Sequence, residues 1–444
     1  MPDLVVRAQR VWLDGVLRPA QVQVSGGVVT AVLPFDPPAD GVLTLPDDEV
    51  LLPGLVDSHV HVNEPGRTAW EGFASATRAA AAGGVTTIVD MPLNSIPPTT
   101  TVEALAAKEA AAEGKLTVDV AFWGGAVPSN LGSLKALHDA GVRGFKSFLA
   151  PSGVDEFEYL PATLLEPALA EIASIGSVLI VHAEDPAHLH EAHGRSYDDF
   201  LASRPPVSER EAIAHVIDAM RTTGARAHIL HVSAADSLDL VRAARAEGLP
   251  LTVETCPHYL TLRSEDVPAG ATEFKCCPPI RDGANQDLLW DAVLDGTFDA
   301  IVSDHSPATV DVKSVGGGDF GLSWGGIAGL QLGFTVVWTQ ARRRGIPLEA
   351  IMPLFTTGPA RVAGIAAGVI EVGAPAHLVA FAPDDERVVD VRTLEHKNPV
   401  SPYDGASVVG LARTVWLHGA PIVTDGAVST PGTGRTILPE PVRA

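Results

Sequence analysis

Between residues 54 and 304 the sequence alternates short apolar segments with alanine-rich ones, and this alternation constrains the fold more than any other feature. The apolar segments are rich in valine and isoleucine, as is typical of strands buried on both faces. Strands separated by helices predict a parallel sheet, and eight of them are enough to close a (β/α)₈ barrel. The predicted strands are 54–61, 85–91, 117–123, 142–148, 178–183, 227–232, 251–256 and 300–304.

An open, doubly wound parallel sheet is the main alternative to a barrel. That fold would need a glycine-rich phosphate-binding turn directly after an early strand, whereas Gly83 and Gly84 precede the strand at 85–91. We therefore predict an α/β fold of the TIM-like barrel type. Its helices are predicted at 70–82, 101–112, 131–140, 162–174, 208–222, 235–247 and 285–294, with further helices at 326–344 and 347–355.

Both ends of the chain carry short β-like segments punctuated by glycine and proline. We predict that residues 1–52 and 366–444 fold together into a small β-sandwich domain beside a barrel domain of residues 53–365. The segments that suggest strands are 4–7, 21–24 and 28–32 at the start of the chain, and 368–373, 377–381 and 415–444 at its end.

The net charge of −23 argues against nucleic acid or an anionic membrane surface as a partner. No apolar run is long enough to span a membrane, and the first residues lack the basic and then apolar pattern of a signal peptide. The 3 cysteines show no disulfide spacing, which fits a reducing compartment. We therefore expect a cytoplasmic protein whose partner is neither nucleic acid nor a membrane.

Metal-binding side chains stand where several predicted strands end. His59 and His61 lie two residues apart, so the periodicity of a strand points both imidazoles the same way. In a barrel of this type the active site lies at the carboxyl ends of the strands. Any one of these residues could be a hydrogen-bonded core residue, but their number at one rim favours a metal site. The candidate ligands are His59, His61, Lys146, His182, His231 and Asp304.

Lys146 is the unusual member of this set, because an ammonium in an apolar strand is costly to bury. Burial lowers the pKa of a lysine and favours the neutral amine. A neutral amine can add carbon dioxide to form a carbamate, whose two oxygens can each bind a cation. A salt bridge to an acidic residue of the barrel is the alternative.

These residues, in this order, resemble the amidohydrolase superfamily, specifically its cyclic amidase branch of dihydroorotases, hydantoinases and allantoinases. The resemblance runs over essentially the whole chain, so it implies a hydrolase with a barrel fold. The motifs that carry it are Pro53-Gly54-Leu55-Val56-Asp57-Ser58-His59-Val60-His61, Gly144-Phe145-Lys146-Ser147-Phe148, Val181-His182-Ala183-Glu184, His231-Val232-Ser233 and Ser303-Asp304-His305-Ser306-Pro307.

The resemblance implies a binuclear metal centre bridged by Lys146 in its carboxylated form, N6-carboxylysine. The two histidines of the first strand would hold one divalent ion, and His182 and His231 the other. Asp304 would join the first ion and act as general base and then general acid in opening a ring amide. Zinc is the expected metal, although cobalt or manganese would suit the same ligands. A homotetramer is also implied.

The residue two past the second histidine of the first strand separates the candidate substrates. Dihydroorotases usually carry an arginine there to hold the substrate carboxylate, whereas this chain has Asn63. A neutral ring therefore suits this site better. The surrounding segments 63–73, 90–95, 256–259, 277–281 and 324–329 resemble allantoinases, which convert allantoin to allantoate.

A hydantoinase or dihydropyrimidinase is the main alternative activity; a dihydroorotase or a non-catalytic homologue fits less well. We expect substrate contacts from Asn63, Asn94, Ser306, Gly325 and Gly326. Asn94 could instead form a turn, and Ser306 could cap a helix. The glycine-rich loop 314–323 departs from the commoner sequences, so its role stays open.

Overall fold

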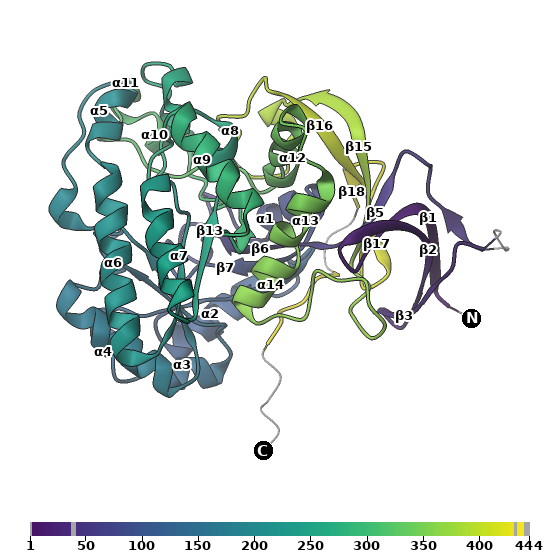
Figure 1. Ribbon diagram of the computed structural model, residues 1–444, viewed down its shortest axis with the longest axis horizontal. Helices are drawn as coiled ribbons and strands as arrows, with labels where there is room; N and C mark the ends of the chain where they lie inside the picture. Colours follow the sequence, from purple (N-terminus) through teal and green to yellow (C-terminus); the bar gives the residue numbers. More distant parts are fainter. Residues whose placement is uncertain (1, 37–40, 430–432, 439–444) are drawn as a thin grey trace.

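Eight parallel strands close into a barrel at the centre of the protein (Figure 1). This computed structural model describes residues 2–36, 41–429 and 433–438. Consecutive strands β8 and β9 join the two hydrogen-bonded runs of the barrel, and at the second seam the His61 N–H donates to the His305 carbonyl at 2.8 Å. The strands are β6 Leu55–Val60, β7 Val85–Asp90, β8 Asp119–Phe122 with β9 Gly124–Gly125, β10 Phe145–Phe148, β11 Val178–His182, β12 Arg226–Ile229, β13 Leu251–Thr255 and β14 Ala300–Ile301.

The predicted alternation of strands and helices is confirmed, with helices covering the outside of the barrel (Figure 1). The largest difference is that α12 begins at Gly333 rather than at residue 326, because Gly325 and Gly326 belong to a loop that lines a cavity. None of the helices within the described ranges is long and apolar enough to cross a membrane. The longer helices are α1 Phe73–Ala82, α2 Val102–Ala112, α3 Leu134–Ala140, α4 Ala162–Ser174, α6 Pro206–Thr223, α7 Leu238–Ala246, α9 Gly283–Leu294, α12 Gly333–Arg343, α13 Leu348–Phe355 and α14 Thr357–Ala363.

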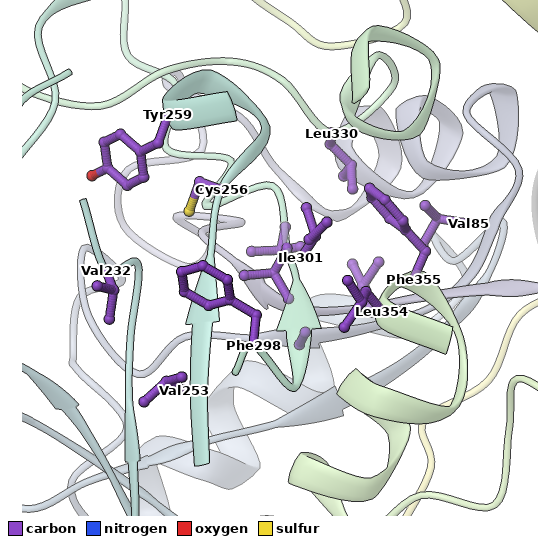
Figure 2. Packing of buried hydrophobic residues seen from close by; sticks show 14 of the residues in the cluster. Val85, Val232, Val253, Cys256, Tyr259, Phe298, Ile301, Leu330, Leu354 and Phe355 are labelled. Carbon is purple, nitrogen blue, oxygen red and sulfur yellow. The ribbon is translucent and has the colours of Figure 1, made fainter. Parts of the chain in front are cut away.

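Apolar side chains of the helices and strands form one large cluster around the barrel. Figure 2 shows Leu354 and Phe355 of α13 pointing toward Ile301 of β14. Fully burying a side chain of this size contributes about 1.5–3 kcal/mol relative to leaving it exposed. This packing therefore anchors the last barrel strand, which leads directly to Asp304.

Both ends of the chain build one nine-stranded sheet beside the barrel, as the sequence predicted (Figure 1). Neighbouring residues of its strands face opposite sides: Leu51 and Leu378 enter a core of the sheet's own, whereas Leu52 and Val379 join the barrel cluster. The sheet therefore packs on the barrel with one face. Its strands are β1 Leu4–Leu13, β2 Val16–Ser25, β3 Val28–Leu33, β4 Leu43–Thr44, β5 Val50–Pro53, β15 Leu378–Val388, β16 Ser407–Leu417, β17 Ala420–Thr424 and β18 Ala427–Val428.

Residues 368–373 were expected to be a strand but form none. Part of the predicted segment 415–444 falls on residues 430–432 and 439–444, outside the described residues. The domain boundaries at 52/53 and 365/366 stay a prediction.

A buried ion pair connects α2 to the barrel. The Lys108 ammonium donates to Asp90 at 2.5 Å and to the Met91 carbonyl at 2.8 Å, and the second Asp90 oxygen accepts from the Val62 N–H at 2.8 Å. The Lys108 side chain is 1% exposed and the Asp90 side chain is 0% exposed. Losing one partner leaves the other charge uncompensated in the interior, which is far more destabilising than losing a surface pair.

We therefore expect Lys108→Ala to lower the free energy of unfolding by about 3–5 kcal/mol in denaturant titrations. Lys135→Ala is the matched control, because Lys135 pairs with Asp139 on the exposed surface of α3 and should change the midpoint little. Equal midpoints for the two variants would contradict the stabilising role of the buried pair.

Candidate metal centre

The six predicted ligand side chains come together at the carboxyl ends of the barrel strands. All of them line one cavity of about 310 Å³, and all six residues are buried. His59 and Lys146 lie within β6 and β10, and His182 ends β11. His231 and Asp304 follow β12 and β14 after short turns. Closure of the barrel thus gathers side chains that are far apart in the sequence.

The first half of the centre is held across the seam between β6 and β14. His59 Nε2 lies 3.1 Å from the Asp304 carboxylate, and His61 Nε2 lies 3.5 Å from the same oxygen. Asp57 clamps the two strands, because one of its oxygens accepts from the His59 N–H at 3.1 Å and the other from the Ser303 N–H at 3.0 Å. The seam itself therefore sets the separation between the histidines and Asp304.

The second half is formed by His182 and His231. His182 Nδ1 and His231 Nε2 face one another at 3.0 Å. The other nitrogen of His182 lies 2.7 Å from Glu184, whose carboxylate also accepts from Arg204 at 2.7 Å, and the Phe148 ring stacks on the imidazole. These contacts fix the His182 ring with Nδ1 toward the cavity.

The electrostatics favour the protonation states that bind metals. Burial lowers the pKa of His61 to about 4, and burial also lowers the pKa values of His182 and His231. Burial by itself would raise the pKa of Asp304, but His59 holds that pKa well below its usual range. At His59 burial lowers the pKa, but the neighbouring carboxylates, chiefly that of Asp304, together outweigh it and the pKa is raised. The site therefore presents neutral imidazoles at His61, His182 and His231 beside an ionised carboxylate.

Burial also lowers the pKa of Lys146 to about 8, against the opposing effect of nearby acidic groups such as Asp304. No carboxylate of the described residues forms a salt bridge with its ammonium, so the structure gives no support to the salt-bridge alternative. The neutral amine that carbamate formation requires is thus accessible close to neutral pH.

Glu254 orients His59 from behind and was not predicted. Its carboxylate lies 2.6 Å from His59 Nδ1 and 2.9 Å from His228 Nε2, which leaves His59 Nε2 directed at Asp304. Burial would raise the pKa of Glu254, but these histidines lower it to about 2. A glutamate inside the apolar strand β13 was the available signal in the sequence.

Four residues at this rim have the left-handed backbone conformation that non-glycine residues seldom adopt. The φ angles are 64° at Asn63, 64° at Asn94, 37° at His231 and 42° at Asp304. Such conformations cost on the order of 1–3 kcal/mol each and concentrate at functional sites. At His231 and Asp304 the sharp turn directly after the strand places the side chain in the cavity.

The predicted substrate contacts divide into two groups. Asn94, Ser306, Gly325 and Gly326 line the same cavity as the ligands. Asn63 is not among the lining residues, and its side-chain amide instead donates to the Pro307 carbonyl at 3.3 Å. The positive φ at Asn63 gives this asparagine a local structural role.

Two cationic residues of the cavity wall, Arg204 and Lys275, were missed. Arg204 is paired with Glu184, and the Lys275 ammonium donates to the Ser323 carbonyl at 2.6 Å. Neither lies near a histidine motif in the sequence, so only the folded loops reveal them. Position 63 therefore carries no cation, but other positions of the cavity wall do.

The glycine-rich loop covers one side of the cavity. Phe320 stacks on Phe200, and the Trp324 ring packs at 4.7 Å from Trp70. At Gly321 a Cβ atom would lie 1.9 Å from the Ala192 carbonyl oxygen, so only glycine permits this close approach. Leu322, Ser323 and Trp324 all line the cavity. The loop therefore forms part of the wall that a substrate would meet.

The residues present suit a pair of divalent ions. Among the described residues, His59 Nε2 is buried, faces Asp304 at 3.1 Å and forms no hydrogen bond. His61 Nδ1 and His231 Nδ1 also lack a partner, while the Nε2 atoms of these two rings face Asp304 and His182. Nitrogen and oxygen atoms of His59, His231 and Asp304 also lie within 4.8 Å of one another. Imidazoles and carboxylates are the usual ligands of zinc and of similar metals. An unpaired, oriented imidazole nitrogen in such a cluster favours metal binding over a purely structural role.

Comparison with known proteins agrees with this geometry. Residues 50–419 match the amidohydrolase family. The chain is 53% identical to an allantoinase of Streptomyces avermitilis over 99% of both chains, and 44% identical to an allantoinase of Saccharomyces cerevisiae over 87% of this chain and 86% of the relative.

Among solved structures, the L-hydantoinase of Arthrobacter aurescens superposes with a TM-score of 0.92 at 29% identity, covering 99% of this chain and 100% of the other. The dihydropyrimidinase of Brevibacillus agri superposes with a TM-score of 0.85 at 27% identity over the same shares. The fold is therefore shared with this hydantoinase and this dihydropyrimidinase. The chain belongs to the amidohydrolase family and, within it, to the allantoinases.

Proposed function

We propose that this protein hydrolyses the ring amide of allantoin to give allantoate, at a centre of two divalent metal ions. The convergence of four histidines, a lysine and an aspartate in one buried cavity carries this proposal. The identity of 53% to an allantoinase over nearly the full length of both chains supports the choice of substrate.

In the proposed centre His59, His61 and Asp304 would hold one ion, and His182 and His231 would hold the other. Lys146, carboxylated on Nζ, would be a ligand common to both. Two such ions, when bound, would lower the pKa of a water molecule and polarise the substrate carbonyl. Zinc is the metal we expect, although cobalt and manganese suit the same ligands.

The protein's own side chains would orient the substrate and move the proton. Asp304 accepts a proton from the attacking water and delivers it to the ring nitrogen that leaves. Its carboxylate is ionised in the resting site, as a general base requires. Asn94, Ser306 and the backbone of Gly325 offer hydrogen-bonding groups to the ring and to the ureido arm of allantoin. Gly326 lines the same wall, while its own N–H donates to the Lys275 carbonyl and its carbonyl accepts from Lys313.

Hydrolysis of a simple hydantoin is the second candidate function, favoured by the superposition with the Arthrobacter aurescens hydantoinase. Allantoin is the better candidate because the chain is much closer in sequence to allantoinases. We also propose a homotetramer, from the family resemblance, and a cytoplasmic location, from the 3 cysteines without disulfide spacing.

Purified, metal-loaded protein should open allantoin faster than hydantoin, and dihydroorotate should be essentially inert. Dihydroorotate brings a carboxylate, whereas position 63 carries an asparagine. Of the cations in the cavity wall, Arg204 is already paired with Glu184 and the Lys275 ammonium donates to the Ser323 carbonyl. An unpaired carboxylate in a desolvated site is expected to lower kcat/KM by a factor above about 10³. Comparable kcat/KM values for allantoin and dihydroorotate would overturn the assignment, and a preference for hydantoin would favour the second candidate.

Metal analysis of the loaded protein should find two ions per chain, and Lys146→Ala should lose metal and activity. With ¹³C-labelled bicarbonate, the wild-type protein should show a carbamate resonance that Lys146→Ala lacks, because the buried amine is the group that adds carbon dioxide. Short carboxylic acids should restore a little metal binding to Lys146→Ala. Lys135→Ala is the control and should keep both ions and the resonance. An unmodified Lys146 in fully loaded wild-type protein would exclude the bridging role.

Asp304→Asn should reduce kcat by about 10² or more, the usual scale for a lost general acid–base group. The variant keeps the shape of the side chain, and metal analysis of the same sample separates loss of proton transfer from loss of the ion. Asp155→Asn, which changes an exposed carboxylate in the loop after β10, is the control. Near-normal turnover of the Asp304 variant would remove Asp304 from this role.

A further inference from the structure

Lys313 is a second buried lysine close to the cavity, and the proposed chemistry does not use it. It ends the short helix α10 (Val310–Lys313) in the loop that follows Asp304, and it is only 4% exposed. It is not one of the residues that line the cavity. A buried ammonium outside the reacting site needs a physical reason, because taking that charge out of water is costly.

Backbone carbonyls surround the Lys313 ammonium. Its Nζ lies 3.2 Å from the Trp324 oxygen and 3.4 Å from each of the Thr272 and Lys275 oxygens, and it also donates to the Gly326 carbonyl. Within the described ranges, no carboxylate forms a salt bridge with it. An ammonium has three N–H donors, so it cannot donate a separate hydrogen bond to each of four carbonyls. The arrangement is a carbonyl-lined cation site whose cation is part of the chain.

Burial lowers the pKa of Lys313 to about 8, and the nearby Lys275 ammonium lowers it further, whereas Cys276 acts in the opposite direction. The four carbonyl dipoles are thus the main compensation for its charge. Among the described residues, removing the ammonium would leave the Trp324 and Gly326 carbonyls without a donor, whereas the Thr272 and Lys275 carbonyls keep backbone N–H donors. Two unpaired buried acceptors disfavour the present backbone arrangement.

These carbonyls belong to the two segments that form the substrate side of the cavity. The first is η5 (Thr272–Phe274) with Lys275, and the second is the segment 324–326. The Gly326 N–H donates to the Lys275 carbonyl at 2.8 Å, so the segments are already in contact. A Cβ atom at Gly326 would lie 2.3 Å from the Ser306 carbonyl oxygen, which shows how closely this backbone is packed. Lys313 connects both segments from the side away from the lining.

We propose that the Lys313 ammonium is a built-in cation that organises the substrate-binding wall, by holding the backbones of Lys275 and Gly326 together. It acts as a positioning residue, since it does not touch the reacting atoms. The identity of the ring bound at this wall rests on the proposed function, whereas the order of the loop does not.

The test replaces Lys313 with alanine and supplies the missing ammonium in solution. Lys313→Ala should keep two metal ions per chain, while chymotrypsin should cut the loop at Phe320 or Leu322 about tenfold faster, because local opening becomes easier. The KM for allantoin should rise about tenfold with a smaller change in kcat, as expected for lost ground-state binding. Propylammonium replaces the part of the side chain that alanine lacks, so it should reverse both effects.

Tetramethylammonium is the matched control, because it carries the same charge without an N–H donor and should restore nothing. Lys135→Ala, on the exposed surface, should respond to neither amine. If Lys313→Ala fails to fold, Lys313→Gln retains two N–H donors without the charge and should show partial loosening of the loop.

Unchanged cleavage in the variant, no rescue by propylammonium, or equal rescue by tetramethylammonium would overturn the proposal. Loosening and rescue of the loop in a protein that does not turn over allantoin would support the role of Lys313 and reject the proposed function.

Discussion

The seam between the first and last barrel strands is the constraint on which the site depends. A backbone hydrogen bond, donated by the His61 N–H to the His305 carbonyl, and the Asp57 carboxylate, which accepts from both sides of the seam, hold β6 and β14 in register. These contacts place Asp304 3.1 Å from His59. Because both sides of the contact are backbone groups or buried carboxylate oxygens, the register cannot drift without leaving polar groups unsatisfied. A one-residue slip would move a ligand to the opposite face of its strand.

Burial favours neutral imidazoles in the centre, and buried carboxylates orient the imidazole rings. In an apolar barrel without polar partners, the imidazole rings would be neutral and could rotate. Glu254 fixes His59 and Glu184 fixes His182, because each carboxylate accepts a hydrogen bond from one ring nitrogen and leaves the other facing the cavity. Arg204 in turn neutralises Glu184. These contacts behind the histidines offset the free-energy cost of burying the carboxylates. The ring nitrogens that face the cavity stay available to bind a metal ion.

The sequence predicts the fold, and the convergence of the six candidate ligands in one cavity, because both follow from local patterns. Apolar runs such as 178–183 give the strands, and a histidine or aspartate at the end of such a run can only face the cavity or the opposite side. It fails where position depends on contacts between distant loops. Arg204 and Lys275 enter the cavity wall from segments without strand periodicity, and Asn63 turns away to Pro307. The same limit explains why the helix predicted from residue 326 begins only at Gly333. The apolar residues before Gly333 pack as part of a loop and not along one face of a helix.

The two walls of the cavity are fixed by different physical means. On the metal side, side chains on parallel strands converge because the barrel closes, so their geometry follows from the fold itself. On the opposite side the wall is a glycine-rich loop with little regular structure, which the fold alone does not define. Phe320 anchors it through the aromatic cluster with Phe200, and the Lys313 ammonium gathers its carbonyls. Differences in substrate among proteins that share this barrel can therefore arise in such a loop while the ligand set stays the same, because changes there leave the register of the strands untouched.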